Sequence, residues 1–203
     1  MWFGCVTLFP DMFEALNASG VTGQAFKAGH YHCGFYNPRD YADNPQGYID
    51  DKPYGGGPGM LMQAPPLIAA IQAAKNDAPA GTAVIALTPG GRVFKQADAK
   101  ACAQRPGLIF VSGRYEGFDQ RVIETSVDAT YSIGDYVLTG GELPAMVMMD
   151  TILRYVPGVL GDGDSVIDES FSQGLLEYPQ YTRPAEVAGQ SVPKVLQSGN
   201  HQA

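Results

Sequence analysis

Short apolar runs alternate with helical patterns along most of the chain. The runs WFGCVTLF (2–9), AVIALT (83–88) and GLIFVSG (107–113) have the length of buried parallel strands, and each is followed by a turn signal. Between them, LIAAIQAAK (67–75) and FKQADAKACAQ (94–104) place apolar residues three and four positions apart among good helix formers. This alternation predicts an α/β domain with a mostly parallel sheet flanked by helices.

A further helix and a polar segment follow in the last third of the chain. The helix is predicted at 144–156, where Pro144 suits the first turn and the apolar residues keep the helical period. The segment GDGDSVIDES (161–170) is acidic and nearly free of large side chains, which predicts a flexible interdomain linker. We therefore expect one domain at 1–160 and the start of a second at 171–203, where the chain looks cut short because so few residues cannot form a core.

The composition is that of a globular protein in a reducing compartment. Of the 203 residues, 45% are hydrophobic and 17% are charged, which suits one domain or one domain plus part of another. The odd number of widely spaced cysteines indicates neither a disulfide framework nor a paired-cysteine zinc site, and favours the cytoplasm. No signal peptide is recognised, and the most apolar later stretch is interrupted by Asp150 and Arg154. We therefore expect no export and no membrane span.

The net charge of −8 argues against a general nucleic-acid surface on this chain. Phosphate binding depends on clustered Lys and Arg, and no such run occurs. If the protein binds nucleic acid, the basic surface must be local, come from a symmetry mate, or lie outside these residues.

Three glycine-rich loops follow apolar, strand-like stretches. They are LTPGGR (87–92), SGRYEG (112–117) and IGDYVLTGG (133–141), and in a parallel sheet all three would emerge at the carboxyl edge, where ligands bind. Each loop alone is more often a tight turn, but together they indicate a site read by backbone groups. A fourth cluster, DDKPYGGGPGMLM (50–62), lacks the ending of a phosphate loop and the spacing of a dinucleotide fingerprint, which disfavours ATP and NAD.

Few side chains stand out as chemical groups. His30 and His32 could in principle bind a metal together with Cys33, but an alternating strand would point the histidines and the cysteine to opposite faces. Surface histidines are the better explanation. Arg154 lies in an apolar helix, where its guanidinium either reaches solvent or faces an anion. In the sequence IDESF, the acids Asp168 and Glu169 would ordinarily be solvated.

Several long motifs together resemble the bacterial tRNA (guanine-N1)-methyltransferases, of the SPOUT class. They are DDKPYGGGPGMLM, SGRYEGFDQRV, SIGDYVLTGGELPAM, GLLEYPQYTRP and VPKVLQSGNH, and the likeness covers essentially all 203 residues. The resemblance implies a parallel sheet flanked by helices with a deep trefoil knot, a homodimer with active sites across its interface, and methylation of N1 of the guanosine at tRNA position 37, next to the anticodon. Periodicity alone favours a Rossmann-like sheet, since knots are nearly absent from folds.

The resemblance also implies the residues of the site. S-adenosylmethionine would be bound by Leu87, Thr88, Pro89, Gly113, Tyr115, Glu116, Ser132, Ile133, Gly134, Asp135, Tyr136, Val137, Leu138, Gly140, Gly141 and Pro144. Tyr115 and Glu116 would lie near the methionine part or the target base. Mg²⁺ is a candidate second cofactor, with Glu177 standing where the family commonly has Asp; no metal ligands are assigned.

Methyl transfer to N1 needs a base for the N1 proton and a cation for the charge that grows on O6. By resemblance these are Glu169 and Arg154. The family usually has Asp before Ser-Phe, so Glu169 adds a methylene to the base, and Asp168 is the alternative.

Two other functions remain open from the sequence: a related methyltransferase acting on another RNA, and a non-catalytic binding module. The family continues past these residues into a basic helical domain, so we expect this chain to bind S-adenosylmethionine but to methylate tRNA poorly.

Overall fold

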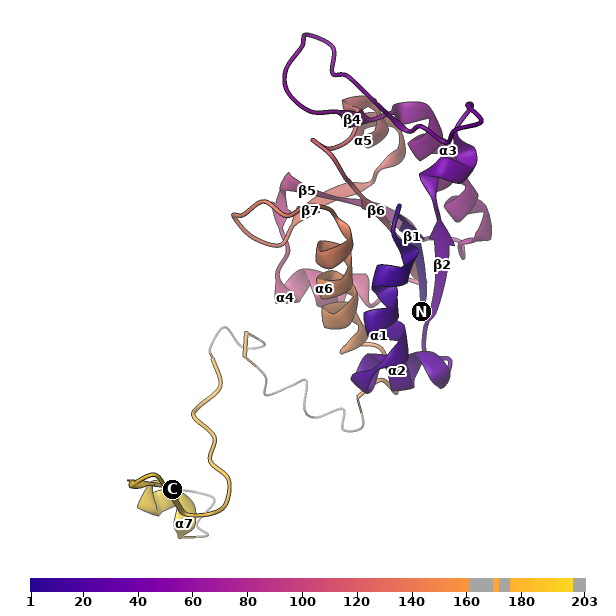
Figure 1. Cartoon of the computed structure of the whole chain (residues 1–203). Helices are drawn as coiled ribbons and strands as arrows, with labels where there is room; N and C mark the ends of the chain where they lie inside the picture. The colour runs from indigo at the N-terminus through magenta and orange to yellow at the C-terminus, as the bar shows by residue number, and fades with distance from the viewer. Residues whose placement is uncertain (161–169, 172–175, 199–203) are drawn as a thin grey trace. The chain divides into compact units, whose positions relative to one another are not determined.

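The computed structural model describes residues 1–160, 170–171 and 176–198 (Figure 1). The chain divides into two compact units, Met1–Ile167 and Asp168–Ala203. The first unit contains the sheet and the pocket described below.

Five parallel strands form the sheet of the first unit. Their order is β2-β1-β6-β5-β7, and every neighbouring pair is parallel. The strands are β1 (Trp2–Val6), β2 (His32–Tyr36), β5 (Ala83–Val93), β6 (Gly107–Ser112) and β7 (Ala129–Ser132). The predicted α/β fold with a parallel, helix-flanked sheet is thus confirmed.

Successive strand residues point to opposite sides of this sheet, so its apolar strands present an apolar surface on each face. Helices cover both faces. In β6, Leu108 and Phe110 join one buried cluster, while Ile109 and Val111 join the other. The first cluster includes side chains of α2 (Gly20–Lys27), α4 (Gln96–Cys102) and α6 (Glu142–Leu153), and the second those of α3 (Ala64–Asp77) and α5 (Gln120–Ser126) (Figure 1).

Short elements connect these layers. The remaining ones in the first unit are η1 (Pro10–Phe13), α1 (Glu14–Ala18), η2 (Pro38–Tyr41) and the antiparallel pair β3 (Asp50–Asp51) and β4 (Leu61–Met62). The strand predicted at 2–9 is shorter in the structure, since a 3-10 helix begins at Pro10 and Phe9 is exposed. The helix predicted at 144–156 starts earlier, at Glu142, with Pro144 in its first turn as expected.

The strand predicted at 83–88 is longer than expected, because β5 contains a bulge. Leu87 and Arg92 both pair with Tyr131, so residues 88–91 leave the ladder between them. Gly91 closes this bulge against Tyr131, where a Cβ on residue 91 would lie 2.5 Å from the Tyr131 carbonyl carbon. Glycine is therefore required for the second half of the strand to pair.

The second unit contains only small elements among its described residues. These are the antiparallel pair β8 (Glu186–Val187) and β9 (Gln190–Ser191), and α7 (Lys194–Gln197). Of the segment predicted as a linker (161–170), all but Ser170 lies outside the described residues. The division into a domain at 1–160, a linker and a second domain stays a prediction. Within the part of the chain that is described, no helix is long and apolar enough to cross a membrane.

Candidate functional site

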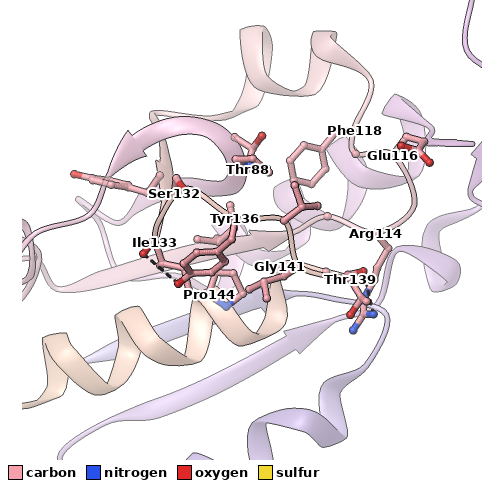
Figure 2. A pocket seen from close by; sticks show the side chains of 18 of the residues that line it. Thr88, Arg114, Glu116, Phe118, Ser132, Ile133, Tyr136, Thr139, Gly141 and Pro144 are labelled. Carbon is pink, nitrogen blue, oxygen red and sulfur yellow. Dashed lines mark hydrogen bonds between the residues drawn. The ribbon is translucent and has the colours of Figure 1, made fainter. Parts of the chain in front are cut away.

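A pocket opens beside the bulge of β5 and the ends of β6 and β7. It is lined by the bulge after Leu87, by the loop from Gly113 to Phe118, and by the segment from Tyr131 to Pro144 (Figure 2). Its volume is about 170 Å³, several times the roughly 30 Å³ that one water occupies in the liquid. The three glycine-rich loops singled out in the sequence therefore form one pocket that can hold part of an organic ligand.

The lining includes every residue expected to bind S-adenosylmethionine except Asp135, which is exposed on the same loop. Their role in binding stays a prediction. The sequence interpretation missed five lining residues: Arg114, Gly117, Phe118, Tyr131 and Thr139. All but Tyr131 lie inside or beside loops that were already chosen, so treating each loop as a continuous segment would have found them.

The segment after β7 folds back on itself by short-range hydrogen bonds. The Ser132 hydroxyl donates to the Gly134 carbonyl oxygen at 3.0 Å, and the Gly134 N–H donates back to the Ser132 hydroxyl at 3.2 Å. The Tyr136 hydroxyl donates to the Ile133 carbonyl oxygen at 3.3 Å (Figure 2). These contacts, each between residues at most three positions apart, shape one wall of the pocket.

Two adjacent glycines form the floor of the pocket, at residues 140 and 141. The Gly141 N–H donates to the Gly113 carbonyl oxygen at 2.9 Å, and a Cβ on residue 141 would lie 2.7 Å from Ser112 Cα. A Cβ on residue 140 would lie 2.3 Å from Arg114 Nε. At residue 141 the obstructing atoms are backbone, and at residue 140 they are the ends of the Arg114 and Glu142 side chains, so a Cβ at either position would displace the surrounding structure.

A buried ion pair lies next to this floor. Glu142, in the first turn of α6, is fully buried, and its Oε2 lies 2.9 Å from Arg114 Nε. Its Oε1 accepts a hydrogen bond of 2.8 Å from the Thr7 hydroxyl. Burial of this carboxylate is offset by one hydrogen bond, at Oε1, and by the ion pair at Oε2, whose contact with Arg114 Nε does not have hydrogen-bond geometry.

The fourth glycine cluster, 50–62, lies against the pocket loop. The Glu116 N–H donates to the Met60 carbonyl oxygen, and the Met62 N–H to the Gly117 carbonyl oxygen, both at 2.9 Å. Gly59 has φ +81°, and a Cβ there would come 2.3 Å from Glu116 Cγ. The sequence left this cluster undecided between a simple loop and a site; in the structure it supports Glu116.

Tyr115, the residue before Glu116, has a left-handed backbone with φ 59°. This conformation is uncommon outside glycine and is typical of functional or strained positions. Partial burial and the nearby Asp50 carboxylate raise the pKa of its phenol above the usual value. Tyr115 is thus a neutral hydrogen-bonding group at physiological pH.

Among the residues expected to carry the chemistry, only Arg154 belongs to the described part of the chain. Arg154 follows the last residue of α6, is half-buried and does not line the pocket, whereas Pro144 at the other end of that helix does. Asp168 and Glu169 lie outside the described residues.

The described part of the chain gives no indication of a metal site. It contains no cluster of three or more His, Cys, Asp or Glu side chains that could hold a metal ion. The candidate Mg²⁺ therefore has no support, and Glu177 is exposed. His32 is exposed and His30 is half-buried, so the expectation of surface histidines holds for His32 and only in part for His30.

The parallel sheet and the glycine-floored pocket at its carboxyl edge define an α/β protein with a pocket of a size for part of a small organic ligand. A family model described as tRNA (guanine-1)-methyltransferase TrmD matches residues 1–203. The chain belongs to this family, which confirms the resemblance seen in the sequence.

Relatives named tRNA (guanine-N(1)-)-methyltransferase align along almost the whole chain. The protein of Chromohalobacter salexigens is 54% identical over 209 residues, which cover 100% of this chain and 78% of the relative. That of Vibrio cholerae is 53% identical over 202 residues, covering 100% of this chain and 82% of the relative. That of Pseudoalteromonas atlantica is 53% identical over 201 residues, which cover 99% of this chain and 76% of the relative.

Proposed function

We propose that this protein transfers the methyl group of S-adenosylmethionine to N1 of the guanosine at tRNA position 37, beside the anticodon. Membership of the family supports the reaction class. The observation that carries the proposal is the pocket, in which the lining residues expected for the cofactor come together from three separate loops. The three cysteines are free, which suits the reducing cytoplasm where tRNA is modified.

The chemistry of the lining fits an adenosyl group joined to an amino acid. Leu87, Ile133 and Leu138 are apolar side chains against which a purine can pack, and the glycine floor leaves backbone groups close to a ligand. The Glu116 carboxylate lines the pocket as well and can pair with an ammonium group. When bound, S-adenosylmethionine supplies a methyl group that its sulfonium makes electrophilic.

The proposal includes the trefoil knot of this class of methyltransferases. Two close backbone crossings support it: Gly91 against Tyr131, and Gly141 against Ser112. Crossings this tight need residues without a Cβ, and both fall on glycines beside the pocket. The knot would then hold the pocket loops in place before the cofactor binds.

The proposal also includes a homodimer whose active sites lie across the interface. Exposed apolar side chains support a contact surface beside the pocket: Val137 is 82% exposed, and Leu143 and Val147 on α6 are nearly half exposed. The dimer also explains the position of Arg154. The 12 residues of α6 extend about 18 Å, and Arg154 follows the end of this helix that is remote from the pocket of its own chain. We place Arg154 in a site that the partner subunit completes.

In the proposed reaction Glu169 accepts the N1 proton of guanine, with Asp168 as the alternative base. Arg154 stabilises the negative charge that develops on O6 as this proton leaves. The pocket loops fix the position of the bound molecule, so that nucleophile and methyl carbon meet in line. The protein therefore supplies position, a base and a cation.

Two measurements test the proposal in order. Calorimetric titration with S-adenosylmethionine should give saturable binding by the folded protein. Methyl transfer is then followed to two tRNA transcripts that differ only in G or A at position 37. Transfer to the G transcript alone supports the proposal, because only guanine has an N1 proton to lose. Failure to bind the cofactor would overturn it, and equal labelling of both transcripts would overturn the assigned target.

A further inference from the structure

The buried carboxylate of Glu142 connects parts of the pocket that are far apart in the sequence. One of its oxygens accepts the hydrogen bond from Thr7, which is 1% exposed at the end of β1. The other is paired with Arg114, in the loop after β6. Glu142 itself opens α6, where a negative charge is favoured by the helix N-terminus. Three elements therefore meet at one carboxylate.

The guanidinium of Arg114 is engaged by the protein and is not directed at a ligand. Besides Nε at Glu142, its Nη1 donates to the Thr139 carbonyl oxygen at 3.3 Å, and its Nη2 lies 3.3 Å from the Met12 sulfur. The guanidinium carbon of Arg114, Cζ, lies 4.4 Å from the centre of the Phe9 ring. Figure 2 shows the Arg114 side chain beside Thr139, across the pocket from Ser132. Although Arg114 lines the pocket, its charged end acts as an internal support.

The glycine floor rests directly on this ion pair. A Cβ on Gly140 would lie 2.3 Å from Arg114 Nε and 2.6 Å from Glu142 Oε2, so no other atom lies between the backbone and the two charges. Arg114 also holds the carbonyl oxygen of the preceding residue, Thr139. A shift of the guanidinium would therefore move the floor.

We propose that Glu142 and Thr7 are positioning residues which hold Arg114 as a strut under the glycine floor, so that cofactor affinity depends on a buried pair that does not touch the cofactor. The identity of that ligand, S-adenosylmethionine, rests on the proposed function. The strut itself is a property of the ligand-free chain: it preforms the pocket, and less ordering remains to be done on binding.

Two matched sets of variants test this role. Glu142→Gln keeps the size of the side chain and removes its charge, and should weaken S-adenosylmethionine binding at least about tenfold, as losses of supporting contacts commonly do. Thr7→Val keeps the shape of threonine without its hydroxyl and should weaken binding several-fold. Thr7→Ser retains the hydroxyl and should restore affinity to near that of the unchanged protein.

A control separates positioning from general stability. Tyr36→Phe removes a partly buried hydrogen bond of 2.7 Å to Asp77, outside the pocket lining. It should lower the melting temperature and leave cofactor affinity unchanged. All variants are titrated well below their melting temperatures, so that a weaker affinity reports the pocket and not unfolding.

Amide hydrogen exchange gives a readout that needs no ligand. The Gly141 N–H, bonded to the Gly113 carbonyl oxygen, should exchange faster in Glu142→Gln and Thr7→Val, but not in Tyr36→Phe or Thr7→Ser. If the unchanged protein does not bind the cofactor, the proposed function fails. The exchange rate of the Gly141 N–H then still tests whether Glu142 and Thr7 hold Arg114 in place. Unchanged exchange together with unchanged affinity in Thr7→Val and Glu142→Gln overturns the inference; if Glu142→Gln does not fold, the two Thr7 variants decide it.

Discussion

The backbone N–H of Gly141 donates to the carbonyl oxygen of Gly113 at 2.9 Å, which joins the entrance of α6 to the end of β6. The two residues are far apart in the sequence, and both line the pocket. At this crossing a side chain on residue 141 would meet the Ser112 backbone, which cannot rotate away as a side chain can. The pocket therefore depends on a contact between two stretches of bare backbone.

Gly141→Ala should consequently damage both the fold and the pocket. The φ of −82° at residue 141 suits alanine, so the cost is steric, about 1–3 kcal/mol of unfolding free energy. Alanine also reduces the conformational entropy of the unfolded chain, which raises the free energy of unfolding by about 0.4–1 kcal/mol and offsets part of this cost. We expect a net destabilisation in urea unfolding and a weaker affinity for S-adenosylmethionine. An alanine variant with unchanged stability and affinity would show that the two backbones can separate without harm.

Neighbouring glycines in the β5 bulge should respond differently to the same substitution. Gly91→Ala places a Cβ 2.5 Å from the Tyr131 carbonyl carbon, whereas a Cβ on Gly90 would meet nothing within 4 Å. Gly91→Ala should lower the free energy of unfolding by about 1–3 kcal/mol, because the added Cβ overpacks the site. Gly90→Ala should leave it unchanged or raise it by up to about 1 kcal/mol, because alanine reduces the conformational entropy of the unfolded chain. Urea unfolding of the two variants side by side measures this. Equal losses would contradict the crossing at Gly91.

Much of the fold could be predicted because its strands are buried on both faces. The runs at 83–88 and 107–113 are nearly continuous apolar stretches, which is the pattern of central parallel strands. The strand β7 (Ala129–Ser132) was expected only as a strand-like stretch before the loop at 133, without bounds, since ATYS is short and half polar. The bulge in β5 was missed as well, because Pro89, Gly90 and Gly91 read locally as the end of a strand. Only pairing with Tyr131 on both sides of the bulge makes the chain continue.

The candidate site could be predicted where it consists of loops and not where it consists of long-range pairs. Glycine-rich turns after apolar runs are visible locally, and the carboxyl-edge rule for parallel sheets brings them together. The link from Thr7 through Glu142 to Arg114 joins residues up to 135 positions apart. In the sequence Glu142 has no feature that separates it from other acids near helix starts, because burial and pairing are set by tertiary structure.

The buried cysteines should make stability depend on pH above the physiological range. Burial raises the pKa of the Cys33 thiol to about 12, and it also raises those of Cys5 and Cys102. An unfolded thiol ionises near pH 8.5. Stability from the protonated folded thiol is therefore complete below about pH 8.5 and is lost as the pH rises towards 12.

Urea unfolding at pH 7.5 and pH 9.5 in reducing buffer measures this loss. For Cys33 alone the expected decrease is about 1.4 kcal/mol. A Cys33→Ala variant should show a decrease smaller by roughly that amount, with the comparison between the two pH values cancelling any direct packing cost. Identical pH dependence in both proteins would mean that Cys33 ionises equally easily when folded.

The assignment of the base rests on two adjacent acids, and substitution can distinguish them. Glu169→Gln should slow methyl transfer to tRNA by about 10²–10⁴-fold, the usual contribution of a positioned base, with cofactor affinity unchanged. Asp168→Asn should keep most of the activity, and Glu169→Asp, which restores the residue usual in the family, should remain active. Single-turnover rates at saturating S-adenosylmethionine isolate this step from binding. If Asp168→Asn is the variant that loses activity while Glu169→Gln keeps it, Asp168 is the base, and the extra methylene of Glu169 places that carboxylate out of reach of N1.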